Sequence, residues 1–173
     1  MKKEIWFDMD GTIANLYAIE GWLNYLIEEN TYPYDKAGTM LNFSLLARYL
    51  NKLQQLGWYI GIASWASKEA SEYFYEKIVI SKSNWLNKHL KSVTWNEIKV
   101  LPYGTNKFEA CGGGILFDDE EKNRNAWKDI AYTPDKIIEI LKGLITNPLT
   151  CRRPYIYTEI LHKYFFIFIK KNT

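Results

Sequence analysis

Two aspartates one residue apart follow the first apolar stretch of the chain. Ile5-Trp6-Phe7 is a short apolar run, and Asp8-Met9-Asp10-Gly11-Thr12 comes directly after it. Because side chains alternate along a strand, Asp8 and Asp10 are expected on the same face. Two carboxylates this close repel each other unless a cation or a proton lies between them. The motif therefore favours a metal-assisted site, although an Asp-Gly pair at a strand end also suits a plain turn.

Composition indicates an ordinary globular chain. It has 173 residues, of which 47% are hydrophobic and 24% charged, enough for one domain with a sizeable core. A net charge of +2 without a Lys/Arg tract gives no strong nucleic-acid signal. No apolar stretch reaches the ~18 residues of a membrane span. Two cysteines give no disulfide framework, so we expect a cytoplasmic location.

Short apolar strands alternate with helical patterns, which predicts an α/β fold with a mainly parallel sheet. Strands are expected over 5–7, 58–63, 98–101 and 113–117. Helices are expected over 13–29, 43–56, 67–77, 83–90 and 133–143. We expect a core over 1–143 with a small helical cap insert at about 15–42. Residues 144–173 would form a C-terminal extension that packs on this core.

Polar side chains follow three of the predicted strands: Asp8 with Asp10, Ser64, and Asp118 with Asp119. In an open parallel sheet, ligands bind outside the carboxyl ends of the strands. Lys107 lies in the loop before the last of these strands. One edge is thus expected to gather carboxylates, a hydroxyl and an ammonium group. Ligands that are all oxygen favour Mg²⁺ over zinc.

This pattern resembles the haloacid dehalogenase-like hydrolase superfamily. The first motif of that family, DxDGT after a strand, is similar to Asp8-Met9-Asp10-Gly11-Thr12. The second, a strand ending in Ser or Thr, is similar to residues 60–64, and the fourth, a strand ending in paired acids, to residues 115–119. The resemblance covers about residues 3–143 and implies a Rossmann-like three-layer sandwich.

The third motif of the family is a single lysine. Lys107 has the expected placement shortly before the fourth motif, and Lys82 and Lys88 compete with it. The resemblance implies that this lysine and Ser64 bind the transferring phosphoryl group and offset its charge.

The resemblance also implies a Mg²⁺-dependent phosphatase that works through an aspartyl-phosphate. Asp8 would be the nucleophile, and Asp10 would protonate the leaving oxygen and then deprotonate water. The metal would bind Asp8, the backbone carbonyl of Asp10, and Asp118. Asp119 would orient Lys107 or a metal-bound water. Asn123 would support the metal loop.

Within the superfamily the chain looks most like the 5′(3′)-deoxyribonucleotidase-like branch, although the insert is short for the cap of that branch. This implies a 5′-nucleotidase-like enzyme acting on a nucleotide or another small phosphorylated metabolite. Trp22 and Trp65 would then line the pocket of the base. Two alternatives stay open: a phosphatase for nucleic-acid 3′ or 5′ ends, and a catalytically silent binding module on the same fold.

Overall fold

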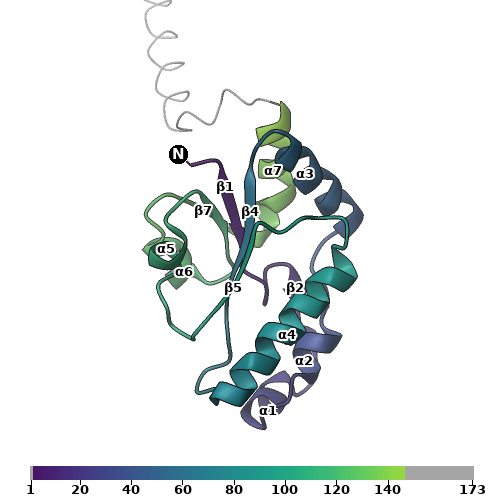
Figure 1. The fold of residues 1–173 in the computed structure, drawn as a ribbon, viewed down its shortest axis with the longest axis vertical. Helices are drawn as coiled ribbons and strands as arrows, with labels where there is room; N and C mark the ends of the chain where they lie inside the picture. The colour runs from purple at the N-terminus through teal and green to yellow at the C-terminus, as the bar shows by residue number, and fades with distance from the viewer. Residues whose placement is uncertain (1, 147–173) are drawn as a thin grey trace, which may run out of the picture.

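A parallel sheet forms the centre of the computed structural model, which describes residues 2–146 (Figure 1). Its five strands are β1 (Glu4–Phe7), β4 (Tyr59–Trp65), β5 (Glu97–Leu101), β6 (Ile115–Phe117) and β7 (Ile130–Tyr132). Their spatial order is β5-β4-β1-β6-β7, and all four neighbouring pairs are parallel. The predicted α/β class with a parallel sheet is therefore confirmed.

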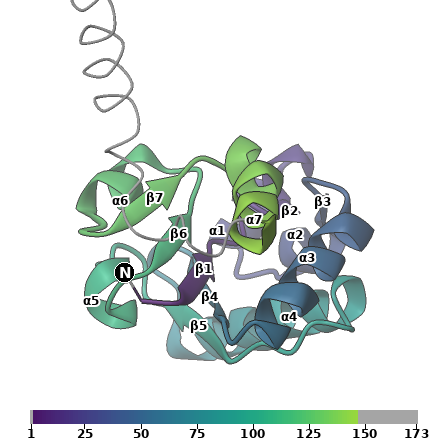
Figure 2. The same ribbon diagram turned by 90° about the horizontal axis from the view of Figure 1, so that it is seen from above.

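Helices cover both faces of this sheet and complete three layers (Figure 2). On one face lie α3 (Phe43–Gln55), α4 (Glu72–His89) and α7 (Ile137–Thr146), and on the other α5 (Lys107–Cys111) and α6 (Glu121–Ala126). Ile5 and Phe7 belong to the large core under the first group. Trp6, which points the other way, packs with Trp127 in a smaller core. Because both faces are covered, the central strands β1, β4 and β6 are largely apolar on both sides.

The helix α4 differs from the prediction of two helices over 67–77 and 83–90. It is a single helix of 18 residues, and the side chain of Ser71 caps it by accepting a hydrogen bond from the Phe74 amide. Its middle turn holds Ser81 and Lys82, which are buried. These polar residues interrupt the apolar stripe that marks a helix in sequence, so the pattern suggested a break where the structure has none.

The insert between β1 and α3 forms a small cap beyond the carboxyl end of the sheet (Figure 1). It contains β2 (Ala14–Asn15), the 3₁₀ turn Leu16–Ala18, α1 (Trp22–Ile27), α2 (Tyr32–Lys36) and β3 (Gly38–Thr39), with β2 and β3 antiparallel. The predicted helix over 13–29 is wrong, because Gly21 adopts a left-handed φ of 69° and α1 begins only after it.

Three contacts hold the cap to α4. The amide and hydroxyl of Ser71 donate to the Glu29 carboxylate at 2.9 and 2.8 Å. Trp85 Nε1 donates to the Ala37 carbonyl at 2.7 Å, and the Ser81 hydroxyl donates to Asp35. The cap is thus fastened at its middle and at its end.

The C-terminal part of the described chain holds further differences. The sequence did not predict α5, α6 or β7. The last helix begins with a 3₁₀ turn (Pro134–Lys136) and α7 continues through Gly143 to Thr146, so the domain boundary expected at 143 falls inside a helix. Residues 147–173, most of the predicted extension, lie outside the described residues. Within residues 2–146, no helix is both long and apolar enough to cross a membrane.

Gly61 gives β4 the room that the smaller core requires. An added Cβ there would lie 2.3 Å from the ring of Trp6, whose side chain is only 1% exposed. The indole of Trp6 therefore lies directly over the backbone of β4, and no side chain fits between them.

We predict that Gly61→Ala lowers the free energy of unfolding by about 1–3 kcal/mol, the usual cost of overpacking a core. Urea titration of both proteins would measure it. Gly143→Ala is the matched control, because a Cβ at Gly143 has nothing within 4 Å and alanine is the better helix former. A Gly61→Ala variant as stable as the wild type would contradict the close packing.

Candidate active site

The carboxyl edge of three neighbouring strands gathers the residues that the sequence singled out. Asp8 follows β1, Asp118 follows β6, and Ser64 is the last but one residue of β4. The Asp8 amide donates to the Phe117 carbonyl at 2.8 Å, which extends the β1–β6 ladder by one residue. The backbone register therefore sets Asp8 beside Asp118.

Gly11 and Thr12 lock the loop after β6 onto the turn after β1. Gly11 has a φ of 74°, and a Cβ on it would lie 2.4 Å from a carboxylate oxygen of Asp119. Thr12 Oγ1 accepts a hydrogen bond from the Asp119 amide at 3.0 Å and lies 3.3 Å from Asp119 Oδ1, to which it donates. Gly11 and Thr12 therefore have a structural role: Gly11 leaves room for Asp119, and Thr12 holds it by hydrogen bonds.

Lys107 begins α5, where the Asn106 side chain accepts hydrogen bonds from two backbone amides of the first turn. Its Nζ donates to Asp8 Oδ1 at 2.9 Å and to Asp118 Oδ2 at 2.6 Å. Burial alone would lower the pKa of Lys107, but the charges of Asp8 and Asp118 raise it overall. Of the two roles expected of Asp119, the orientation of this lysine is not seen, because Asp8 and Asp118 are its partners; the orientation of a metal-bound water stays a prediction.

A second buried lysine also reaches the site. Lys82 Nζ donates to Asp10 Oδ2 at 2.6 Å, to Ser64 Oγ at 2.7 Å and to the Trp65 carbonyl at 2.9 Å. The two candidates Lys107 and Lys82 are thus both present, each with a different aspartate. Lys88, the third candidate, is exposed in the last turn of α4.

The surroundings of Asp10 differ from those of Asp8. Burial raises the pKa of Asp10, the positive charge of Lys82 opposes this rise, and the net direction is upward. Its carboxylate faces Lys82 rather than the other acids. The binding of a metal by the backbone carbonyl of Asp10 stays a prediction.

Three carboxylates form a group that could hold a cation. Oxygens of Asp8, Asp118 and Asp119 all lie within 4.8 Å of one another. Burial and the charge of Asp8 raise the pKa of Asp118 to about 6. Burial and the charges of Asp8 and Asp118 raise that of Asp119 to about 7. One ammonium group therefore does not balance these acids, and a set of oxygen donors short of positive charge fits Mg²⁺.

Residues of α6 support this group from behind. Asn123 Nδ2 lies 3.2 and 3.1 Å from the two carboxylate oxygens of Asp118 and donates to them. Arg124 Nη1 donates to the backbone carbonyls of Asp118 and Asp119 at 2.8 and 2.6 Å. Asn123 thus contacts Asp118, while its support of a metal loop stays a prediction, and Arg124 is a supporting residue that sequence reasoning missed.

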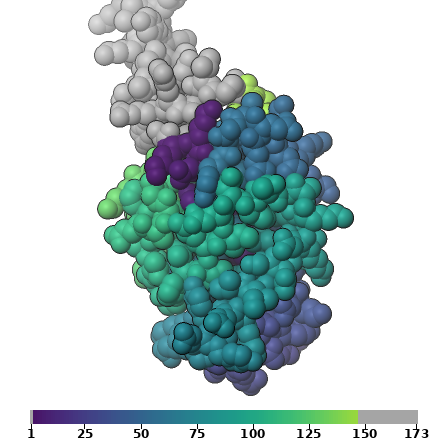
Figure 3. Space-filling view, viewed as in Figure 1, coloured from purple at the N-terminus to yellow at the C-terminus, as the bar shows by residue number. Residues whose placement is uncertain are grey.

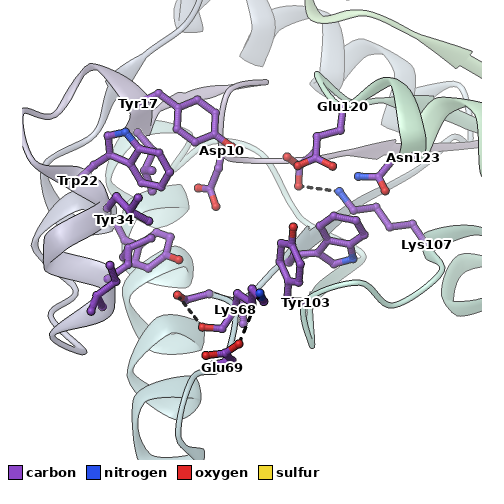
Figure 4. Close-up of a pocket in the computed structure, with 18 residues that line it drawn as sticks. Asp10, Tyr17, Trp22, Tyr34, Lys68, Glu69, Tyr103, Lys107, Glu120 and Asn123 are labelled. Atoms are coloured by element: carbon purple, nitrogen blue, oxygen red, sulfur yellow. Dashed lines mark hydrogen bonds and ion pairs between the residues drawn. The ribbon is translucent and has the colours of Figure 1, made fainter.

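A cavity of about 400 Å³ opens next to Asp8 and Asp10, between the cap and the sheet edge (Figure 4). Lys107 and Asn123 lie at one side of it. Its aromatic walls are Tyr17, Trp22, Tyr34, Trp65 and Tyr103. The space-filling view shows that cap and core surfaces meet around this end of the molecule (Figure 3). The site is therefore a pocket with an apolar wall and a charged floor.

Both tryptophans that the sequence proposed line this cavity. Trp65 donates from Nε1 to the Thr105 carbonyl at 2.9 Å, and its ring lies 5.1 Å from Lys107 Nζ. The ring of Trp22 meets Tyr17 edge-on at 5.0 Å. Ser64, in contrast, is fully buried and is not part of the cavity wall. Its predicted contact with a phosphoryl group stays a prediction.

Comparisons with known proteins add little to this picture. No protein-family model matches the chain, and no curated protein matches it. Among solved structures, the chain is similar to the crystal structure of D,D-heptose 1,7-bisphosphate phosphatase from Burkholderia thailandensis. The identity is 12%, the TM-score is 0.48, and the match covers 84% of this chain and 99% of that one. The fold class above rests on the strand order of this chain.

The raised pKa values of Asp118 and Asp119 predict how stability depends on pH. Unfolded aspartates ionise near 3.8, whereas these two ionise near 6 and 7 in the folded protein. Between these values the folded state binds more protons, so the free energy of unfolding falls as pH rises. We expect this fall in urea titrations with a chelator present. Asp119→Asn should flatten its upper part, and the exposed Asp135→Asn should not. Equal slopes for all three proteins would contradict the assignment.

Proposed function

We propose that this chain is a Mg²⁺-dependent phosphomonoester hydrolase of the haloacid dehalogenase-like superfamily that works through an aspartyl-phosphate. The observation that carries the proposal is the different pairing of two aspartates at one strand end. Asp8 contacts Lys107 beside the acidic group, whereas Asp10 contacts Lys82. Two carboxylates in different surroundings can serve as nucleophile and as acid–base group.

The residues act in two steps. The carboxylate of Asp8 attacks phosphorus, while Asp10 gives its proton to the leaving oxygen as the ester bond breaks. Asp10 then takes a proton from the water that attacks the aspartyl-phosphate, which releases phosphate and restores Asp8. Lys107 uses two of its three N–H bonds on Asp8 and Asp118, and the third can contact a phosphoryl oxygen. Mg²⁺, held by Asp8, Asp118 and the Asp10 carbonyl, would neutralise phosphoryl charge.

The cavity supports a small phosphorylated substrate with an apolar or aromatic leaving group. We infer that a nucleotide fits best, because Trp22, Tyr34 and Trp65 offer ring faces or edges beside the nucleophile. Apart from Lys107, Lys68 is the one cation in the cavity wall, and it pairs with Glu69 at 3.5 Å. A nucleic-acid end would need a longer basic track than these residues provide.

The proposal also includes the division of the chain. The sheet and its helices form a phosphatase core, and the insert at about 15–42 is a small cap that gives the leaving group its pocket. Both tryptophans of the specificity argument fit this division, since Trp22 comes from the cap and Trp65 from the core.

Asp8→Asn should remove turnover while the fold stays intact. An amide is a far weaker nucleophile than a carboxylate, so we expect a loss of at least about a thousandfold in kcat. A release assay with nucleotides, sugar phosphates and oligonucleotide ends, with and without Mg²⁺, would measure it and identify the substrate class. Asp135→Asn, an exposed aspartate near α7, is the matched control. Turnover by Asp8→Asn within tenfold of the wild type would reject the nucleophile.

Trp22→Ala should weaken the binding of nucleotides in particular. Stacking on a base contributes about 1–3 kcal/mol, so KM for a nucleoside monophosphate should rise about tenfold or more. The KM for glycerol phosphate, which has no ring, should stay the same. Tyr25→Ala is the control on the same helix, because Tyr25 stacks on Tyr32 and does not line the cavity. Equal changes for both substrates would remove the support for a nucleotide.

A further inference from the structure

Lys82 is a buried cation that has no role of its own in the two proposed steps. Its side chain has no exposed surface, and the ring centroid of Tyr34 lies 4.9 Å from its Nζ. An ammonium group has three N–H donors, and Lys82 has three acceptors within 2.9 Å: Asp10 Oδ2, Ser64 Oγ and the Trp65 carbonyl. No donor is left for a substrate phosphate. This separates Lys82 from Lys107, which lines the cavity.

The contact with Asp10 distinguishes the two oxygens of this carboxylate. Oδ2 is held by Lys82 at 2.6 Å. Within residues 2–146, Lys82 is the one hydrogen-bond partner of the Asp10 side chain, which lines the cavity and is 17% exposed. The free oxygen, Oδ1, is therefore the one that can carry a proton to the leaving group.

The contact with Ser64 fixes the direction of a hydroxyl. Because Lys82 donates to Ser64 Oγ, the hydrogen of this hydroxyl must point away from the ammonium group. The Ser64 hydroxyl can therefore donate only in directions away from Lys82. The third contact, to the Trp65 carbonyl, ties the same lysine to the end of β4.

We propose that Lys82 is a positioning residue for the acid–base step: it selects the oxygen of Asp10 that meets the leaving group and keeps the Ser64 hydroxyl a donor. This rests on the proposed function. The two lysines then divide the work, because Lys107 serves the nucleophile and Lys82 serves the proton carrier. Lys82 itself touches no substrate atom.

The test compares substrates that differ in their need for a proton. Each kcat is taken for the first step alone, from single-turnover release of the leaving group, because both substrates share the later hydrolysis of the aspartyl-phosphate, which Asp10 also serves. Alkyl phosphates need protonation of the leaving oxygen, whereas p-nitrophenyl phosphate needs little. Misplaced catalytic groups cost up to about a hundredfold, so Lys82→Met should lower kcat for glycerol phosphate by about ten- to a hundredfold. It should lower kcat for p-nitrophenyl phosphate by less than about threefold and leave both KM values unchanged. Lys88→Met, on the exposed end of the same helix, is the control.

A double-variant cycle shows whether Lys82 acts through Asp10. In the Asp10→Asn background, Lys82→Met should not change the ratio of the two kcat values further. This neutral double variant also avoids a buried unpaired carboxylate. Should Lys82→Met alone fail to fold, as judged by thermal melting, Lys82→Gln serves instead, because its amide still donates a hydrogen bond but carries no charge.

Three outcomes would overturn this proposal and leave the proposed function standing. Equal losses of kcat for both substrates would indicate a general structural role. A raised KM with unchanged kcat would make Lys82 a phosphate-binding residue. A further change of the ratio in the Asp10→Asn background would separate Lys82 from Asp10. A wild type without turnover of any phosphate ester would reject the proposed function and this proposal together, whereas the first three outcomes reject this proposal alone.

Discussion

The site depends on a charge balance between buried carboxylates and two buried ammonium groups. A carboxylate removed from water without a partner costs several kcal/mol, so the acids at this edge require nearby cations. The cations come from opposite faces of the sheet: α5 contributes Lys107 and α4 contributes Lys82. Asp8 and Asp10, which lie close together after β1, are therefore paired with lysines from helices on opposite faces of the sheet. The positive charge that is still missing at Asp118 and Asp119 is what a divalent metal would provide.

The same layered arrangement explains why the surrounding residues are so constrained. Asp8 and Asp118 continue the ladders of their strands, since the Asp8 amide donates to Phe117 and the Asp118 amide to Tyr132. Their separation is thus fixed by the strand spacing. Gly11 then lets the loop of Asp119 approach closely. Backbone geometry therefore places the acidic group. Lys107 reaches this group from α5 with its long side chain, and Lys82 reaches Asp10 from α4 in the same way.

The sequence predicted the parts of this structure that local patterns encode. The strands β1, β4 and β6 are apolar runs that end in polar residues, and α3 has a regular stripe with Asn42 as its cap. The secondary structure inside the cap insert, the short helices α5 and α6, and β7 were missed, because each depends on long-range packing more than on periodicity. The role of Lys82 was also out of reach. Its burial is tolerated only because Asp10, Ser64 and Trp65 meet it in three dimensions.

The fastening of the cap to α4 has a consequence for how a substrate would be selected. A segment tied through Glu29, Asp35 and Ala37 is ordered when the chain folds, not when a ligand arrives. The entropy of forming the pocket is then lost in folding, and binding does not have to supply it again. Recognition in such a preorganised pocket depends on fit to a standing shape. For the proposed function, binding would then not have to wait for this segment to become ordered, unlike in enzymes whose lid closure limits the turnover rate.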